Sequence, residues 1–145
     1  MSYIYLIVPI VAVSVAQLSK FFIPQNKLAW KLRSLVAYSG MPSSHAAITI
    51  SLSTIIALRL GFDSAQFAIA ALFTLLSLRD AVGIRQYIGR QGKVLNELVG
   101  DLGDDSYIDD SYPILKERVG HTPKQLLVGA AIGFIIALLG HYLIV

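Results

Sequence analysis

The sequence predicts an all-α integral membrane protein, built as a helical bundle of about four transmembrane helices with one interfacial and one amphipathic helix. Hydrophobic residues make up 55% of the chain and charged residues only 14%, a composition too apolar for an ordinary soluble domain. Several segments are long enough to cross roughly 30 Å of hydrocarbon as helices. A length of 145 residues fits a single membrane domain, which we expect over residues 1–145.

Four apolar segments are expected to span the membrane. The first carries no charge before Lys20 and is closed by Pro24, because proline cannot continue a helix. The second and third are joined by the short turn Gly61-Phe62-Asp63, so we expect them to be antiparallel neighbours. The expected spans are residues 2–23, 44–60, 65–78 and 125–145.

Two alternatives to this assignment stay open from the sequence. The second and third spans are near the lower length limit for a transmembrane helix, so a soluble bundle with buried helices would also fit them. Residues Ser14-Val15-Ala16 resemble a signal-peptide cleavage site, although the basic segment that opens a signal peptide is missing.

Basic residues are concentrated on one side of the expected bundle. Of the twelve Lys and Arg residues, only Arg59 lies outside the regions that follow the first and third spans. Positive residues favour the cytoplasmic side of a membrane, so we expect a multi-pass protein with these charged loops in the cytoplasm and both termini outside. No basic arm of the kind that binds nucleic acid is present. The absence of cysteine excludes disulfides and thiolate metal sites.

Two further segments are expected to be amphipathic. Residues 27–36 have the pattern of a short basic helix at the membrane interface, anchored to anionic lipid. Residues 81–99 follow a helical period, and Gly89 and Gly92 within them indicate close approach by a ligand or by another backbone. The polar stripe of this helix is either a solvated face or part of a site. Its apolar side holds Ile84, Tyr87, Ile88, Leu95 and Leu98, and its polar stripe holds Arg85, Gly89, Lys93 and Asn96.

Two local patterns each have more than one interpretation. Residues 100–111 contain five aspartates among glycines and serines, which predicts a solvated loop. A divalent cation site is the alternative, although the spacing differs from that of an EF-hand. In the fourth span, Gly129 and Gly133 form a small-xxx-small face that lets another helix pack closely, either in this chain or in a second copy.

The stretch Gly40-Met41-Pro42-Ser43-Ser44-His45 is the most informative part of the chain. Glycine and proline stop the preceding segment and serine is a preferred N-cap, so His45 falls in the first turn of the next helix. A helix start offers unpaired backbone N–H groups and the positive end of the helix dipole, which suits phosphate. An ordinary serine-capped helix with a histidine at its polar boundary is the alternative.

Four cationic or titratable side chains are expected at one level of the bundle. The second and fourth spans begin on the same side of the membrane, which places His45 and His121 there beside Lys20 and Arg85. Hydrolysis of a phosphomonoester needs such groups, because one imidazole can attack phosphorus, another can protonate the leaving oxygen, and fixed cations can hold the other oxygens. Histidines at helix starts and cations at boundaries also occur for structural reasons.

Three sequence blocks in this order resemble the divergent type 2 phosphatidic acid phosphatase family, which is related to acid phosphatases and vanadium-dependent haloperoxidases. The resemblance covers residues from about Gln17 to Gly133 and implies a helical membrane phosphatase that needs no metal or other cofactor. The blocks are Gly40-Met41-Pro42-Ser43-Ser44-His45, then Asp80-Ala81-Val82-Gly83-Ile84-Arg85 with Leu95-Asn96-Glu97, and last Gly120-His121-Thr122-Pro123 with Gly129.

The same resemblance implies roles for three residues. Lys20 corresponds to the first phosphate ligand of the superfamily, His45 to the general acid, and His121 to the nucleophile. An aspartate is expected four residues after the nucleophile, where this chain has Gln125. A carboxylate would orient the imidazole and stabilise its positive charge, which an amide cannot do. Other departures are Lys27 and Leu115, each where an arginine is expected, and Ser44 in place of a glycine.

The resulting hypothesis is a membrane phosphatase that hydrolyses phosphate monoesters, plausibly lipid-linked, through a phosphohistidine intermediate. A non-catalytic protein that binds an anionic headgroup or a partner through the same residues is the alternative. The expected partners are the bilayer, a phosphorylated lipid or other phosphate monoester, and a second copy of the chain. Asp80 or Glu117 would stand in for the missing aspartate. The expected site comprises His121 and His45 as catalytic residues, Lys20, Ser43, Ser44 and Arg85 as phosphate ligands, and Gln17, Asp80, Asn96, Glu117 and Gln125 as supporting residues.

Overall fold

The computed structural model describes residues 3–26, 40–101, 113–117 and 119–143, and these residues form helices and connecting segments without a strand. The expected interfacial helix over residues 27–36 and nearly all of the aspartate-rich segment lie outside the described residues. The elements are α1 (Ile4–Ser19), η1 (Lys20–Phe22), η2 (Pro24–Asn26), α2 (Ser44–Leu60), α3 (Ala65–Val82), α4 (Ile84–Asp101) and α5 (Pro123–Leu143).

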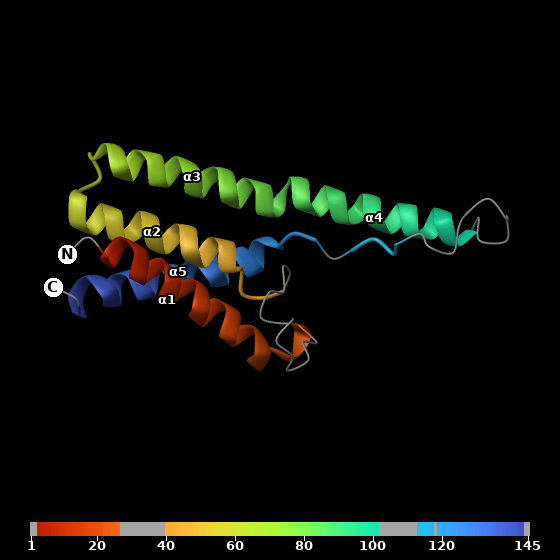
Figure 1. The fold of residues 1–145 in the computed structure, drawn as a ribbon, viewed down its shortest axis with the longest axis horizontal. Coiled ribbons are helices and arrows are strands. Elements are labelled where there is room, and N and C mark those ends of the chain that lie inside the picture. Colours follow the sequence, from red (N-terminus) through yellow and green to blue (C-terminus); the bar gives the residue numbers. More distant parts are fainter. Residues whose placement is uncertain (1–2, 27–39, 102–112, 118, 144–145) are drawn as a thin grey trace.

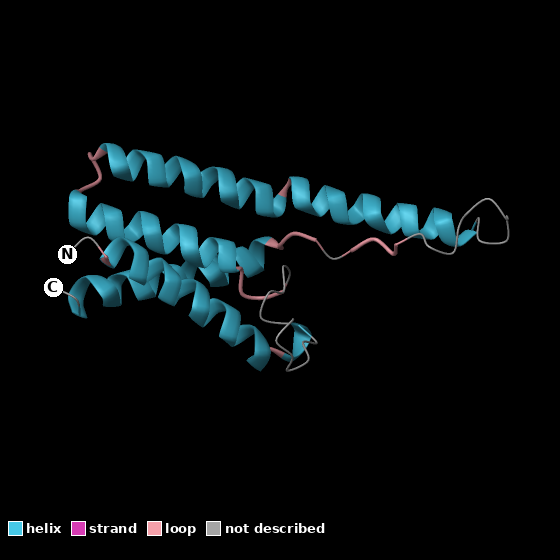
Figure 2. Ribbon diagram, viewed as in Figure 1, coloured by secondary structure: helices cyan, strands magenta, loops and turns pink. Residues whose placement is uncertain are grey.

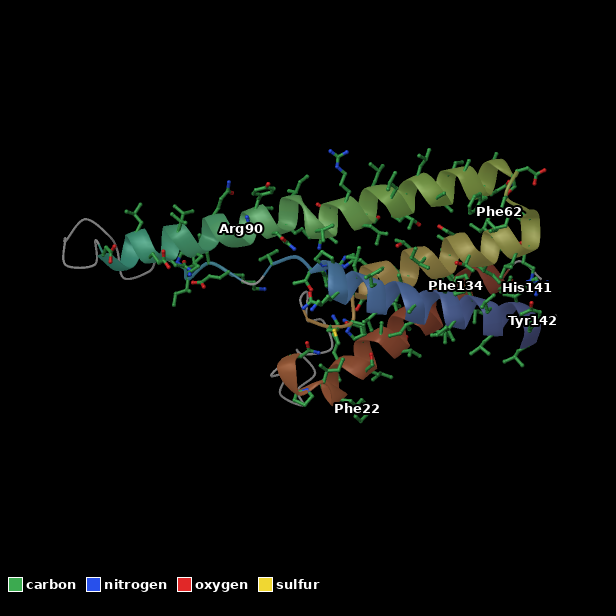
Figure 3. All side chains as sticks on the ribbon, turned by 180° about the vertical axis from the view of Figure 1, so that it is seen from behind. Phe22, Phe62, Arg90, Phe134, His141 and Tyr142 are labelled. Carbon is green, nitrogen blue, oxygen red and sulfur yellow. The ribbon has the colours of Figure 1, made fainter. Side chains whose placement is uncertain are left out.

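Helix α2 is the central element of the bundle. It packs against α1, α3 and α5, whereas α4 continues the direction of α3 beyond the other helices (Figure 1). Of the described segments outside α3, residues 113–117, an extended segment that leads toward α5, lie beside α4 (Figure 2). Phe62, His141 and Tyr142 lie at the end of the bundle opposite to Phe22 (Figure 3). The starts of α2 and α5 and the end of α1 therefore share one end of the molecule.

The predicted fold class is confirmed. Three described helical stretches are long and apolar enough to cross a membrane, namely Ile4–Phe22, Ala65–Asp101 and Pro123–Leu143, and Ser44–Leu60 is a shorter apolar helix. Large apolar side chains such as Leu72, Phe73 and Ile135 are exposed on the outside of the bundle. An all-α bundle with an apolar exterior is the architecture that a bilayer requires, because helices satisfy their own backbone polar groups.

The glycines of α5 allow its backbone to touch α2. A Cβ atom at Gly129 would overlap the carbonyl oxygen of Ser43, and one at Gly133 would overlap the carbonyl oxygen of Ala47. The small-xxx-small face is therefore used within the chain, by two helices that run in parallel. Such close backbone approach is a common source of helix association in membranes.

Hydroxyl groups join α2 to α3. The Ser53 and Thr74 hydroxyls are hydrogen-bonded at 2.7 Å. Ser53 also contacts the carbonyl of Ala70 at 3.1 Å, and the Thr74 hydroxyl donates to the carbonyl of Thr49 at 3.1 Å. Buried polar side chains that hydrogen-bond across helices stabilise such contacts where water is scarce.

A break at Gly83 separates α3 from α4. Helix α3 runs to Val82, beyond the expected end at Leu78. The N–H of Gly83 donates to the carbonyl of Arg79 at 2.8 Å, and the carbonyl of Gly83 accepts from Gln86 N–H at 3.0 Å. Gly83 thus ends one helix and begins the next. A Cβ atom there would lie 2.8 Å from the Arg79 carbonyl oxygen, which explains why glycine occupies the break.

Candidate functional site

The start of α2 is built as its sequence predicts. Ser43 is the N-cap, and its hydroxyl accepts a hydrogen bond from the N–H of Ala46 at 3.4 Å. The preceding Met41–Pro42 peptide bond is cis, and Gly40 has a φ of 106°, a conformation that favours glycine. The turn therefore directs the chain into a helix whose first turn carries His45.

Asn26 ties this turn to the end of the first helix. Its side-chain amide donates to the carbonyl of Lys20 at 2.9 Å and to that of Met41 at 2.7 Å. Its carbonyl oxygen accepts from the N–H of Met41 at 2.9 Å. The half-buried amide of Asn26 thus joins η1 to the turn before α2 and holds Lys20 beside the start of α2. This contact of Asn26 could not be predicted from the sequence, because no periodic pattern links Asn26 to Met41.

Two predicted polar residues complete this junction. The Ser44 hydroxyl donates to Gln17 Oε1 at 2.6 Å, which joins the last turn of α1 to the first turn of α2. Lys20 follows directly in η1 and is only 2% exposed. Burying a lysine ammonium is costly unless polar or charged groups surround it, so its burial is typical of a binding site.

The start of α5 is fixed by a capping box. The Thr122 hydroxyl accepts from the N–H of Gln125 at 3.3 Å, and Gln125 Oε1 accepts from the N–H of Thr122 at 2.9 Å. This reciprocal pair satisfies two backbone donors at a helix start. The main chain of Gln125 also accepts from the N–H of Ser43 at 3.0 Å, so the two helix starts are joined. Gln125 therefore supports the helix start and does not bind the His121 ring.

His121 lies at the centre of the residues gathered here. Its ring is 2% exposed and forms an edge-on pair with the His45 ring, with 5.9 Å between centroids. Neither ring nitrogen has a hydrogen-bond partner among the described residues. Burial, together with the positive charges of Lys20, His45 and Arg85, lowers the pKa of His121 from 6.5 to about 4. The imidazole is therefore neutral at pH 7.

Arg85 enters the site from the first turn of α4. Its Nε atom donates to Asp80 Oδ2 at 2.6 Å, and the two side chains are 33% and 39% exposed. The five-residue separation would place these side chains on different faces of a continuous helix, so the break at Gly83 is what brings them together. Asp80 holds one edge of the Arg85 guanidinium. The positive charge of Arg85 acts on both histidines.

Asn96 and Glu117, also predicted as supporting residues, make contacts along α4. Asn96 binds the backbone of Leu115 on both sides, donating to its carbonyl and accepting from its N–H, each at 2.9 Å. It also donates to Glu117 Oε1 at 3.0 Å. Their contacts hold the extended segment along α4, whereas the charge of Asp80 acts on His45.

The arrangement suits an anion better than a cation. Lys20 and Arg85 place positive charge beside two imidazoles, and the starts of α2 and α5 add the positive ends of two helix dipoles. Within the described ranges, no three His, Asp or Glu side chains are grouped as they would be around a metal ion. The two cations and the two helix N-termini could neutralise the charge of a tetrahedral oxyanion.

Comparison with known proteins places the chain among membrane proteins. A curated relative, the uncharacterized membrane protein YuiD of Bacillus subtilis (strain 168), is 36% identical over 130 residues, which cover 83% of this chain and 81% of the relative. No solved structure matches the chain. Residues 1–136 match the Divergent PAP2 family, in agreement with the resemblance of the three sequence blocks. The chain is a member of the Divergent PAP2 family.

Proposed function

We propose that this protein binds the phosphate group of a phosphomonoester between Lys20, His45, Arg85 and His121, and hydrolyses the ester. One observation carries the proposal: the buried, neutral imidazole of His121 has no hydrogen-bond partner among the described residues, although it lies beside His45 and within the field of two cations. Unpaired buried polar groups are rare in proteins, and a bound ligand is a common explanation.

Several groups favour binding of the phosphate. Lys20 and Arg85 supply positive charge, and Arg85 keeps guanidinium N–H groups beyond the Nε that binds Asp80. The backbone at the start of α2 supplies N–H groups next to Ser43 and Ser44. A phosphate bound among these donors would exchange its hydration for fixed hydrogen bonds.

The two histidines have complementary roles in this proposal. A neutral imidazole keeps the lone pair that a nucleophile needs, and the low pKa of His121 keeps it neutral at pH 7. A ring nitrogen of His121 forms an N–P bond while the ester P–O bond breaks, and the leaving oxygen takes a proton from His45, which enters this step as the imidazolium. Water then attacks the phosphohistidine and gives a proton back to His45, which releases inorganic phosphate.

The substrate and its surroundings follow from the position of the site. The residues lie where α1 ends and where α2 and α5 begin, so a lipid-linked phosphate could reach them while its apolar part stays in the bilayer. We place this end of the bundle in the cytoplasm because of the Lys and Arg bias. A second copy of the chain remains an expected partner.

A second function is favoured by one observation. The side chain of Gln125 is engaged in the capping box, so the His121 ring lacks the carboxylate that stabilises an imidazolium in many hydrolases. Loss of such a carboxylate in a serine protease lowers the rate by about 10⁴. The alternative is therefore a protein that binds an anionic headgroup at the same residues without turnover.

Binding and turnover measured on the same purified protein separate the two functions. Vanadate binding is measured by calorimetry, and turnover is measured as release of inorganic phosphate from a generic aryl phosphate. If the protein is a phosphatase, we expect both vanadate binding and turnover, and we expect His121→Ala to abolish turnover. Vanadate binding without turnover supports the headgroup-binding function. Lys93→Ala is the control, because this lysine is exposed and pairs with Glu97, about two helical turns beyond Arg85 in α4. Absence of both signals contradicts the phosphate site.

A further inference from the structure

The extended segment that leads to His121 is attached along α4. A Cβ atom at Gly89 would overlap the carbonyl oxygen of Glu117, and one at Gly92 would lie 3.2 Å from that of Lys116. Further along the helix, Asn96 binds both backbone groups of Leu115. The close approach indicated by the two glycines is therefore an approach of backbone. Helix α4 acts as the support on which the chain returns to the bundle (Figure 1).

The end of this segment is held most tightly, directly before α5. Gly120 has a φ of 91° and packs against the carbonyl of Ala81 and the backbone of Gln86, each 3.0 Å from its Cβ position. The next residue is held at both of its backbone groups. The N–H of His121 donates to the carbonyl of Ala81 at 2.9 Å, and its carbonyl accepts from Gln86 Nε2 at 2.6 Å.

These contacts contrast with the His121 ring, whose nitrogens bind no described residue. The orientation of the ring therefore depends on its main chain and on packing. We infer that Gln86 is a positioning residue, which fixes the His121 ring in the site by holding the His121 carbonyl from the first turn of α4. Its effect on ligand binding and turnover rests on the proposed function, whereas its effect on the position of His121 does not.

The break at Gly83 gives this role to Gln86. Arg85 and Gln86 are consecutive residues, and they bind Asp80 and His121 respectively. One short turn thus directs a cationic ligand and the main chain of the histidine toward the same place. In the contact with His121, Gln86 must present its amide nitrogen Nε2 and not its oxygen Oε1, because the carbonyl of His121 can only accept a hydrogen bond. The side chain also packs on Gly120 through its Cγ atom.

The inference is tested with two substitutions that separate packing from hydrogen bonding. Gln86→Met keeps the length of the side chain and removes the donor. Gln86→Glu keeps the shape and replaces the donor by an acceptor near neutral pH. Gln91→Met is the matched control, because Gln91 lies exposed on the same helix. The first readout is acylation of His121 by diethyl pyrocarbonate, located by peptide mass spectrometry, in protein whose melting temperature shows that it is folded.

We expect acylation of His121 to be slow in the parent and in Gln91→Met, and to rise up to about tenfold in both Gln86 variants, which is the effect of one net hydrogen bond. Vanadate affinity should fall by a similar factor. For turnover, kcat should fall more than KM rises, since the nucleophile is displaced. Protection of His121 and an unchanged vanadate affinity in both folded Gln86 variants would overturn the inference. Increased acylation in a protein that never binds vanadate would support the positioning role and refute the phosphate site.

Discussion

Gln125 Oε1 accepts a hydrogen bond from the backbone N–H of Thr122, the residue after His121, and does not reach the His121 ring. The separation of four residues between His121 and Gln125 suggested a contact between their side chains. Thr122 and Gln125 also have the three-residue spacing of a capping box, so the sequence was equally consistent with a contact between these two residues. The side-chain amide of Gln125 therefore binds the backbone N–H of Thr122 and not the imidazole of His121.

This relationship predicts the effect of changing Gln125. Gln125→Ala removes one half of the capping box and should lower the free energy of unfolding by about 1 kcal/mol. Gln125→Glu should retain the cap and the stability, because a glutamate accepts the same hydrogen bond and its charge suits a helix N-terminus. Thermal unfolding in detergent measures both effects. A rise in turnover in Gln125→Glu would show that this side chain does reach the imidazole.

The pKa of His121 predicts a dependence of stability on pH. The folded protein holds this pKa at about 4, whereas the ordinary value is 6.5, so the unfolded chain binds a proton more readily. The neutral form therefore contributes stability that is complete above about pH 6.5 and is lost as the pH falls toward 4. The full effect is on the order of 3 kcal/mol.

Thermal unfolding of the parent and of His121→Asn between pH 4 and pH 8 measures this contribution. The difference in stability between the two proteins should shrink as the pH falls, because asparagine does not titrate. A difference that stays constant across this range would show that His121 has an ordinary pKa in the folded protein.

The cationic residues predict a ligand-induced stabilisation. Vanadate at one hundred times its Kd should stabilise the parent by about 2.7 kcal/mol, as for any ligand that binds only the folded state. Lys20→Met and Arg85→Ala should each remove most of this shift. Lys93→Ala should retain it, since Lys93 is exposed and pairs with Glu97. Undiminished shifts in both test variants would exclude Lys20 and Arg85 as ligands.

The contact between α2 and α5 predicts a difference between glycines. Gly129→Ala and Gly133→Ala should destabilise the protein by about 1–3 kcal/mol, because the added methyl group meets a backbone carbonyl of α2. Gly100→Ala is the matched control, since no atom of another described segment lies within 4 Å of its Cβ position. It should be neutral or slightly stabilising, as alanine favours a helix. Equal effects at all three positions would contradict the backbone contact.

The orientation in the membrane can be measured because the chain has no native cysteine. We expect Ser106→Cys to be shielded from an impermeant thiol reagent in intact cells, and Asp63→Cys, in the turn between α2 and α3, to be labelled. Permeabilised cells supply the control, in which both cysteines should react. The reverse pattern in intact cells would place the starts of α2 and α5 on the outside.

The fold was predictable because its signals are local or periodic. A serine cap marked the start of α2, and Ser43 accepts the expected backbone hydrogen bond. Gly129 and Gly133 indicated close helix packing. Their partner was not predictable, because a small-xxx-small face fits a helix of the same chain as well as one of a second copy.

The candidate site was predictable only in part. The sequence pattern singled out Lys20, His45, Arg85 and His121, which the structure brings to one end of the bundle. Asn26 and Gln86 were missed because their contacts lie 15 and 35 residues away in the chain. Each is an amide that binds backbone carbonyls, and such contacts leave no pattern in a single sequence because their partners are defined only by the fold.

The close approach of Gly129 to Ser43 has a consequence for local unfolding. The two helix starts touch through backbone, and the N–H of Ser43 is bonded to the carbonyl of Gln125. Neither start can therefore fray alone without breaking the other's contacts. We therefore expect the amides of these two turns to open as one cooperative unit, with a similar free energy of opening by hydrogen exchange at positions some eighty residues apart.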